Sequence, residues 1–319
     1  MRISSPSLLQ GISRASIAAV CSAVLLLMPV SVHAIAISPS VTEVSGQRGE
    51  VLSETIQIIN TNTTDQTYYL DTLKFKASED GGSPQFISSS EDHEGLPEWI
   101  KLETSTVIVP ALSSAEINYE IRIPSGADSG GHYAAITVSL TPADLIASNG
   151  AIVEAKTASL ILLEVAGENI MKAELLDFLD EQNGGFQSLL GGRFTYRVQN
   201  QGNVHLNPVG TITFKDLFGR VVKQVDANEL GSRVLPLSTR SYEVEVSTST
   251  LSWFETVGEQ MSTFALGPIS VELELAYDDS EETLSGSLTQ FLFPWQLLVT
   301  VLALVFIFLL VYRLGKKRR

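Results

Sequence analysis

The chain has 319 residues, of which 44% are hydrophobic, and it carries 36 Asp and Glu against 21 Lys and Arg, a formal net charge of −15. This acidic balance disfavours nucleic-acid binding, which requires a basic face for the phosphates. The single cysteine excludes an intramolecular disulfide framework, so the stability of the fold must come from core packing.

The N-terminus has the pattern of a secretory signal peptide. Arg2 and Arg14 precede an apolar run from Ile17 to Val30, and small residues lead up to Ala34. We therefore predict that residues 1–34 are a signal peptide. Because Cys21 lies inside this segment, the mature chain is expected to have no thiol.

Residues 35–167 are predicted to form a first immunoglobulin-like β-sandwich, because short runs rich in Val, Ile, Thr and Tyr alternate with turn residues. The clearest strand is Ala115 to Ile123, in which every second residue is apolar. Leu160 to Leu163 is apolar on both faces, which is typical of a central strand. Ser78 to Glu94 contains Gly81-Gly82 and Pro84 and is predicted to be a loop.

Residues 168–290 are predicted to form a second sandwich of the same class. Between two of its strands, Thr250 to Met261 is expected to hold a short helix with Trp253 and Phe254 folded inward. The seven predicted strands are Lys172 to Leu179, Arg193 to Gln199, Val209 to Lys215, Val221 to Val225, Ser241 to Ser247, Ile269 to Tyr277 and Thr283 to Leu288.

The 22 residues from Phe291 to Tyr312 carry no charge and predict a transmembrane helix. At about 1.5 Å per residue, such a helix covers roughly 33 Å, enough to cross the hydrocarbon core. Five cations in residues 313–319 predict a basic cytoplasmic tail, which places the preceding chain outside the cell membrane. The predicted external part has 14 basic and 36 acidic residues, a net charge of −22.

The sequence contains no catalytic constellation. His93, His132 and His205 lack metal-ligand spacing, and neither a nucleophile motif nor a phosphate-binding loop is present. The acidic run from Asp278 to Glu282 is either a solvated turn or a weak calcium locus. We therefore predict a protein that is not an enzyme and has no catalytic, cofactor or metal site.

Two short motifs supply candidate partner-binding residues. Trp99 is either a core residue or an aromatic that stacks on a ligand. Gly130-Gly131, followed by His132 and Tyr133, is either a tight turn with a packed tyrosine or part of a binding surface.

Several segments of the first predicted sandwich resemble the peptidoglycan-binding domain of the WxL-interacting proteins of bacteria. They are Pro39, the turn Gly46 to Gly49, Asn60, Pro97-Glu-Trp-Ile-Lys-Leu102, Pro124 and Gly130-Gly-His-Tyr-Ala-Ala-Ile136. Leu160 to Val165, Gln199 to Pro208 and Lys215 to Gly219 look like related two-sandwich surface proteins. The resemblance implies a non-enzymatic role in attachment at the cell envelope, while the second domain departs from the host-binding domain of that family.

Three functions fit these observations. The first is a membrane-anchored adhesion or binding protein that recognises a cell-wall polymer such as peptidoglycan, or a surface protein. The second is a structural spacer without a ligand. The third is a membrane-tethered glycan hydrolase, which would need two carboxylates about 5 to 10 Å apart beside a groove.

Overall fold

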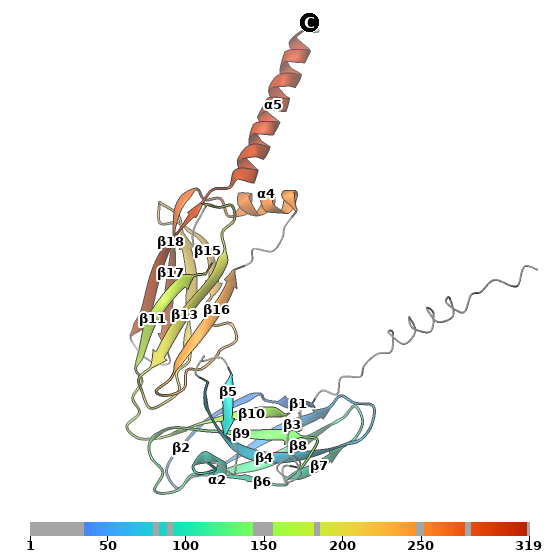
Figure 1. Ribbon diagram of the computed structural model, residues 1–319, viewed down its shortest axis with the longest axis vertical. Coiled ribbons are helices and arrows are strands. Elements are labelled where there is room, and N and C mark those ends of the chain that lie inside the picture. Colours follow the sequence, from blue (N-terminus) through green and yellow to red (C-terminus); the bar gives the residue numbers. More distant parts are fainter. Residues whose placement is uncertain are drawn as a thin grey trace, which may run out of the picture.

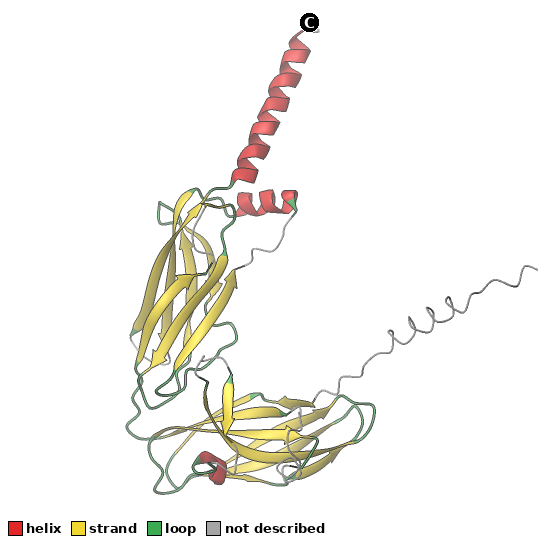
Figure 2. Cartoon of the chain, in the orientation of Figure 1, coloured by secondary structure: helices red, strands yellow, loops and turns green. Residues whose placement is uncertain are grey.

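The computed structural model describes residues 35–78, 83–87, 92–142, 156–181, 186–246, 252–277 and 282–317. These residues form two β-sandwiches arranged as an L and a long C-terminal helix that leaves the far end of the second sandwich (Figure 1). Most of the described chain is strand (Figure 2), so the predicted all-β class with two immunoglobulin-like sandwiches is confirmed. The predicted signal peptide lies outside the described residues.

The first sandwich packs two sheets against each other. One sheet has the order β1-β3-β8-β6, and the other has the order β2-β10-β9-β4-β5, with β7 paired to β4. The strand bounds are β1 Ile35–Ser38, β2 Val41–Gly46, β3 Val51–Asn60, β4 Gln66–Ala77, β5 Pro84–Ile87, β6 Ile100–Leu102, β7 Thr106–Val109, β8 Ser114–Arg122, β9 Gly130–Ser139 and β10 Thr157–Val165. A short helix, α2 (Leu96–Trp99), precedes β6.

Alternating apolar residues from both sheets build the core of this sandwich. Ile117, Tyr119 and Ile121 of β8 face inward and are buried, as the period of two predicts. In β10, Ile161 and Leu163 join the same core, whereas Leu162 packs in a separate cluster on the outer face. β10 lies between β2 and β9, which confirms the prediction of a central strand.

The second sandwich has sheets in the order β11-β13-β16 and β12-β18-β17-β14-β15. All seven strands predicted from the sequence are present, with small changes in bounds, together with a two-residue strand that was not predicted. The bounds are β11 Ala173–Asp180, β12 Phe186–Gln187, β13 Gly192–Asn200, β14 Pro208–Lys215, β15 Val221–Asp226, β16 Thr239–Val246, β17 Gly267–Tyr277 and β18 Thr283–Leu292.

Two helices lie at the end of the second sandwich that is remote from the first. α4 (Trp253–Ser262) lies across the base of α5 (Trp295–Lys317), which extends away from the sandwich (Figure 1). Among the described residues, α5 is the one helix that is long and apolar enough to cross a membrane, judged by length and composition.

The structure corrects three expectations. The predicted loop Ser78 to Glu94 contains β5, which extends the sheet by pairing with the end of β4. The terminal helix begins at Trp295 rather than Phe291, because β18 continues to Leu292 and pairs there with Gly267 and Pro268. The helix at residues 253–262 is present, but its two aromatic residues do not fold inward: Phe254 is 86% exposed.

Candidate functional site

One asparagine makes several hydrogen bonds at the connection between the two sandwiches. Asn203, in the turn after β13, accepts a hydrogen bond from the backbone N–H of Ile170 (2.7 Å) and donates one to the carbonyl of Glu168 (3.0 Å). Its own carbonyl accepts from the N–H of Gly131 in the first sandwich, at 2.8 Å. The linker between the sandwiches and the start of β9 are therefore both hydrogen-bonded to the same turn.

Gly130, Gly131 and Tyr133 lie at this junction. Gly130 has φ of 113° and a Cβ there would lie 2.7 Å from the carbonyl oxygen of Asn203, so the close approach requires glycine. A Cβ on Gly131 would lie 1.9 Å from the hydroxyl oxygen of Tyr133. The two glycines therefore allow the second sandwich and the tyrosine ring to pack onto the start of β9.

Tyr133 also reaches across the junction. Its hydroxyl lies 3.3 Å from Nδ1 of His205, and the two rings meet edge to face with centroids 5.8 Å apart. Burial raises the pKa of the Tyr133 phenol above its ordinary value of about 10.

Trp99 and His132 form a separate pair. Their rings have centroids 4.6 Å apart, and Trp99 also packs against the main core of the first sandwich. His132 Nε2 lies 3.0 Å from the carbonyl oxygen of Asp128. The structure thus places Trp99 beside His132 and Tyr133 beside His205, and it places neither Trp99 nor His132 among the residues that line the cleft described next.

A cleft of about 210 Å³ opens at the inner corner of the L. Its floor is the outer face of the β4-β9-β10 sheet, where Phe75 and Leu162 are buried together with Ala135. The second sandwich contributes Leu235, which packs on this cluster, and Leu230, which is 91% exposed at the rim. The full lining is Val41, Phe75, Ala77, Ser78, Ser83, Pro84, Leu160, Leu162, Leu230, Gly231, Ser232, Arg233, Leu235, Ser238, Thr239 and Arg240.

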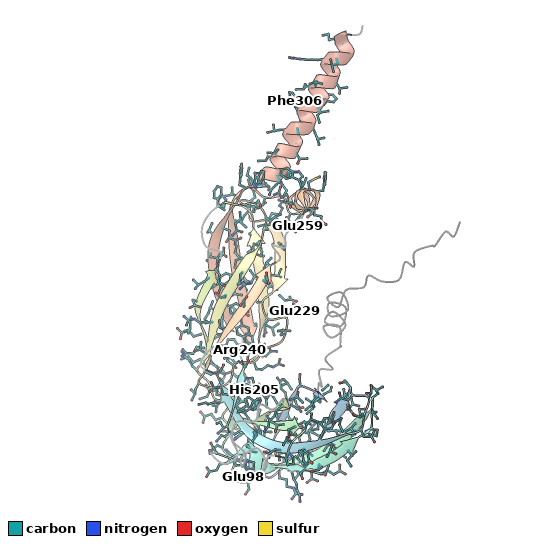
Figure 3. All side chains as sticks on the ribbon, turned by 45° about the vertical axis from the view of Figure 1, so that its right-hand side comes forward. Glu98, His205, Glu229, Arg240, Glu259 and Phe306 are labelled. Carbon is teal, nitrogen blue, oxygen red and sulfur yellow. The ribbon has the colours of Figure 1, made fainter. Side chains whose placement is uncertain are left out.

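Two guanidinium groups belong to the cleft. Arg233 forms an ion pair with Glu43 of β2, which joins the sandwiches across the cleft. Arg240 donates a hydrogen bond to the carbonyl of Arg233 (3.2 Å) and lies 5.7 Å from the ring centroid of Tyr242. Figure 3 shows Arg240 and His205 near the corner where the two sandwiches meet. None of the described residues that line the cleft is a carboxylate.

A second, shallower depression lies over β3, β6 and β8 and contains Glu54, Glu103 and Glu120. Glu103 accepts a hydrogen bond from the side chain of Asn118, and Glu120 forms an ion pair with Arg122. Within the described ranges, no group of three or more His, Cys, Asp or Glu residues could hold a metal ion. The acidic run at Asp278 to Glu281 lies outside those ranges.

The sequence predicted no role at a domain junction for Asn203, His205, Arg233 or Leu235, although His205 was tested as a metal ligand and Gln199 to Pro208 is part of the family resemblance. Asn203 and His205 fall in a run that reads as a turn, and turn composition does not distinguish a surface turn from one that contacts another domain. The one sequence feature that could have indicated a contact between the domains is Leu160 to Leu163. Its apolar residues face both sides of the sheet, so the outer side must also be covered by apolar residues.

No family model matches the chain, and no curated protein matches it. Similar solved structures include the class 5 fimbriae chaperone CfaA, with 14% identity and a TM-score of 0.37 over 82% of this chain and 100% of that one. The E. coli chaperone DraB has 13% identity and a TM-score of 0.34 over 82% and 97%. CsuC–CsuE, a chaperone–tip adhesion subunit complex of Acinetobacter baumannii, has 10% identity and a TM-score of 0.37 over 80% and 97%. At these values the likeness carries no argument about partners or activity.

Proposed function

We propose that this chain is a membrane-anchored, non-enzymatic binding protein that accepts a segment of another surface protein in the cleft between its sandwiches. The single observation that carries the proposal is the cleft itself, in which Val41 and Leu160 of the first sandwich and Leu235 of the second remain partly exposed above the buried Phe75 and Leu162. An apolar concavity with a few polar groups is the usual form of a binding site.

The proposed anchor is α5. Its uncharged part, Trp295 to Tyr312, covers about 27 Å at about 1.5 Å per residue, close to the thickness of a bilayer core of about 30 Å. The cations that end the chain favour a cytoplasmic C-terminus, which puts both sandwiches outside the membrane. On this arrangement the cleft lies beyond the second sandwich, away from the bilayer.

The cleft chemistry favours a protein segment over a glycan. Val41, Leu160 and Leu235 offer partly exposed aliphatic surface for one or two apolar side chains. Burial of apolar area contributes about 25 cal/mol per Å², which favours apolar side chains on this floor, whereas sugar hydroxyls would depend on the polar residues elsewhere in the lining, such as Ser232 and Thr239. The guanidinium groups of Arg233 and Arg240 at the rim suit a carbonyl or carboxylate of the same segment.

The resemblance to WxL-interacting proteins makes peptidoglycan the alternative partner. The third hypothesis, a glycan hydrolase, is not proposed. The described lining of the cleft offers no carboxylate to act as acid or nucleophile, and in the second depression Glu103 and Glu120 are engaged by Asn118 and Arg122.

The proposal is tested by incubating the full-length protein in detergent with purified cell-wall polymer and with envelope proteins from the cells that produce it, and by measuring which of them it binds. Leu160→Glu places a charge in the cleft. The control variant, Ile108→Glu, places the same charge at an exposed apolar position of β7 away from the cleft. We expect one envelope protein to co-purify with the wild type and with Ile108→Glu, and to be lost with Leu160→Glu.

Co-sedimentation with purified cell wall that is abolished only by Leu160→Glu would identify the polymer as the occupant and contradict the protein partner. Absence of any ligand that distinguishes the two variants would favour the spacer and overturn the proposal. Thermal unfolding of both variants verifies that the substitutions leave the sandwiches folded.

A further inference from the structure

The end of the second sandwich that carries α5 has an unusual concentration of exposed apolar residues. Phe218, at the tip of the β14–β15 hairpin, is 93% exposed, and Met261 of α4 is 65% exposed. Further exposed residues at this end are Leu217, Trp253, Phe254, Phe264, Leu266, Phe291, Phe293 and Trp295. Such a patch on a water-soluble surface indicates an interaction.

The pattern of α4 is the reverse of that of a soluble surface helix. At about 100° per residue, Trp253, Phe254, Val257 and Met261 fall on one arc of the helix, yet three of these four are exposed. The two buried positions are the polar residues Thr256 and Gln260. The sandwich therefore does not cover the apolar arc.

The polar side of α4 that carries Thr256, Glu259 and Gln260 is the side that packs. Glu259 lies 3.8 Å from Lys223 of β15 in an ion pair, and Thr256 and Gln260 are buried. At about 100° per residue, Phe254 and Met261 lie on the far side of the helix from Glu259, so they point away from the sandwich. Figure 3 shows Glu259 on α4 at the base of α5.

α4 is fixed to the first turns of α5. Trp253 Nε1 donates to Thr300 Oγ1 (3.2 Å), and the Trp253 and Trp295 rings have centroids 5.4 Å apart. Gln260 donates to Gln296 Oε1 (2.6 Å) and accepts from the N–H of Leu297 (2.8 Å), one of the N–H groups that a helix start leaves without an intrahelical partner. These contacts hold α4 at the level where the apolar part of α5 begins.

We infer that α4 lies in the membrane interface, with Phe254, Val257 and Met261 inserted among the lipid headgroups and upper acyl chains, and that the β14–β15 tip touches the same surface through Phe218. This inference rests on the proposed anchor, since α5 brings the bilayer to this level. A helix in the interface buries one apolar face while its polar face stays in water, and Trp and Phe suit that position. The second sandwich then has a fixed orientation on the bilayer.

Spin labels on the full-length chain in vesicles of phosphatidylcholine and phosphatidylglycerol test the inference. In a Cys21→Ser background, cysteine substitutions Phe254→Cys, Met261→Cys and Phe218→Cys report on the apolar face, and Ser262→Cys is the matched control on the polar face. Leu302→Cys reports on α5. The readout is the accessibility of each label to oxygen, which concentrates in lipid, relative to a water-soluble nickel complex.

We expect an oxygen-to-nickel accessibility ratio that is severalfold higher at positions 254 and 261 than at 262, and highest at 302. A deep label at 302 with water-exposed labels at 254 and 261 would overturn the interfacial helix and leave the anchor intact. A water-exposed label at 302 would overturn the anchor, and the interfacial helix with it.

Discussion

The hydroxyl of Tyr133 lies 3.3 Å from Nδ1 of His205, so a residue of the first sandwich makes a side-chain hydrogen bond to the second. Tyr133 also packs on the cluster formed by Phe75 and Leu162, which is the cleft floor. The shape of the cleft therefore depends on the same contacts that join the sandwiches.

Tyr133→Phe removes this hydrogen bond and retains the ring. A partly buried hydrogen bond contributes about 0.5–1.5 kcal/mol, so we expect the free energy of unfolding to fall by about 1 kcal/mol. Denaturant unfolding of the full chain in detergent measures the change. Tyr69→Phe, near the start of β4 and away from the junction, is the control and should have little effect. Equal losses of unfolding free energy in both variants would contradict the role of the junction.

Gly130→Ala introduces a methyl group at a positive φ and against the carbonyl of Asn203. We expect a loss of about 1–3 kcal/mol, because both the backbone conformation and the contact become strained. Gly126→Ala is the matched control in the preceding turn, where a Cβ would meet nothing within 4 Å. A tolerated Gly130→Ala with an unchanged melting temperature would show that the two sandwiches do not meet there.

The Arg233–Glu43 ion pair links the sandwiches across the cleft. Because both side chains are partly exposed, we expect a coupling energy of at most about 1 kcal/mol in a double-mutant cycle of Arg233→Gln and Glu43→Gln. The larger effect should be a wider distribution of distances between spin labels on the two sandwiches. Arg122→Gln, which breaks an ion pair within β8, should leave that distribution unchanged.

Alkaline pH should destabilise the sandwiches through their buried tyrosines. Burial raises the pKa of Tyr119 to about 12 and also raises the pKa of Tyr133, Tyr196 and Tyr242. In the unfolded chain these phenols ionise near pH 10, so the stability they confer is complete below about pH 10 and is lost as the pH rises toward the folded-state values.

Unfolding free energies at about pH 8 and about pH 11 measure this effect, with ultraviolet absorbance following phenolate formation. Ionisation of all eight tyrosines near pH 10 in the folded protein would contradict the account.

Much of the fold could be predicted because its strands alternate clearly. Ala115 to Ile123 has one wet and one dry face, and β8 occupies that place. The strand β5 was missed because Pro84–Ile87 is short and lies beside glycines that indicate a loop. The contacts of Asn203 and Arg233 depend on how two domains meet, and a local pattern does not encode that arrangement.

The prediction that the aromatic residues of α4 fold inward was wrong for a different reason. Trp253 and Phe254 were expected to fold inward, because aromatic residues are usually buried in a soluble domain. That expectation assumed water on every side of the sandwich. At the end that carries α5, the exposed aromatic residues and the buried Gln260 are consistent with a bilayer surface instead.

The central claim, that a protein segment occupies the cleft, is tested most directly by site-specific photo-crosslinking in the cells that produce the protein. A photoreactive residue in place of Leu230 stands at the rim of the cleft, and one in place of Ile108, which is 67% exposed, stands away from it. We expect one discrete protein adduct from position 230 that is absent from position 108 and disappears with Leu160→Glu. The same adducts from both positions, or none from position 230, would contradict it.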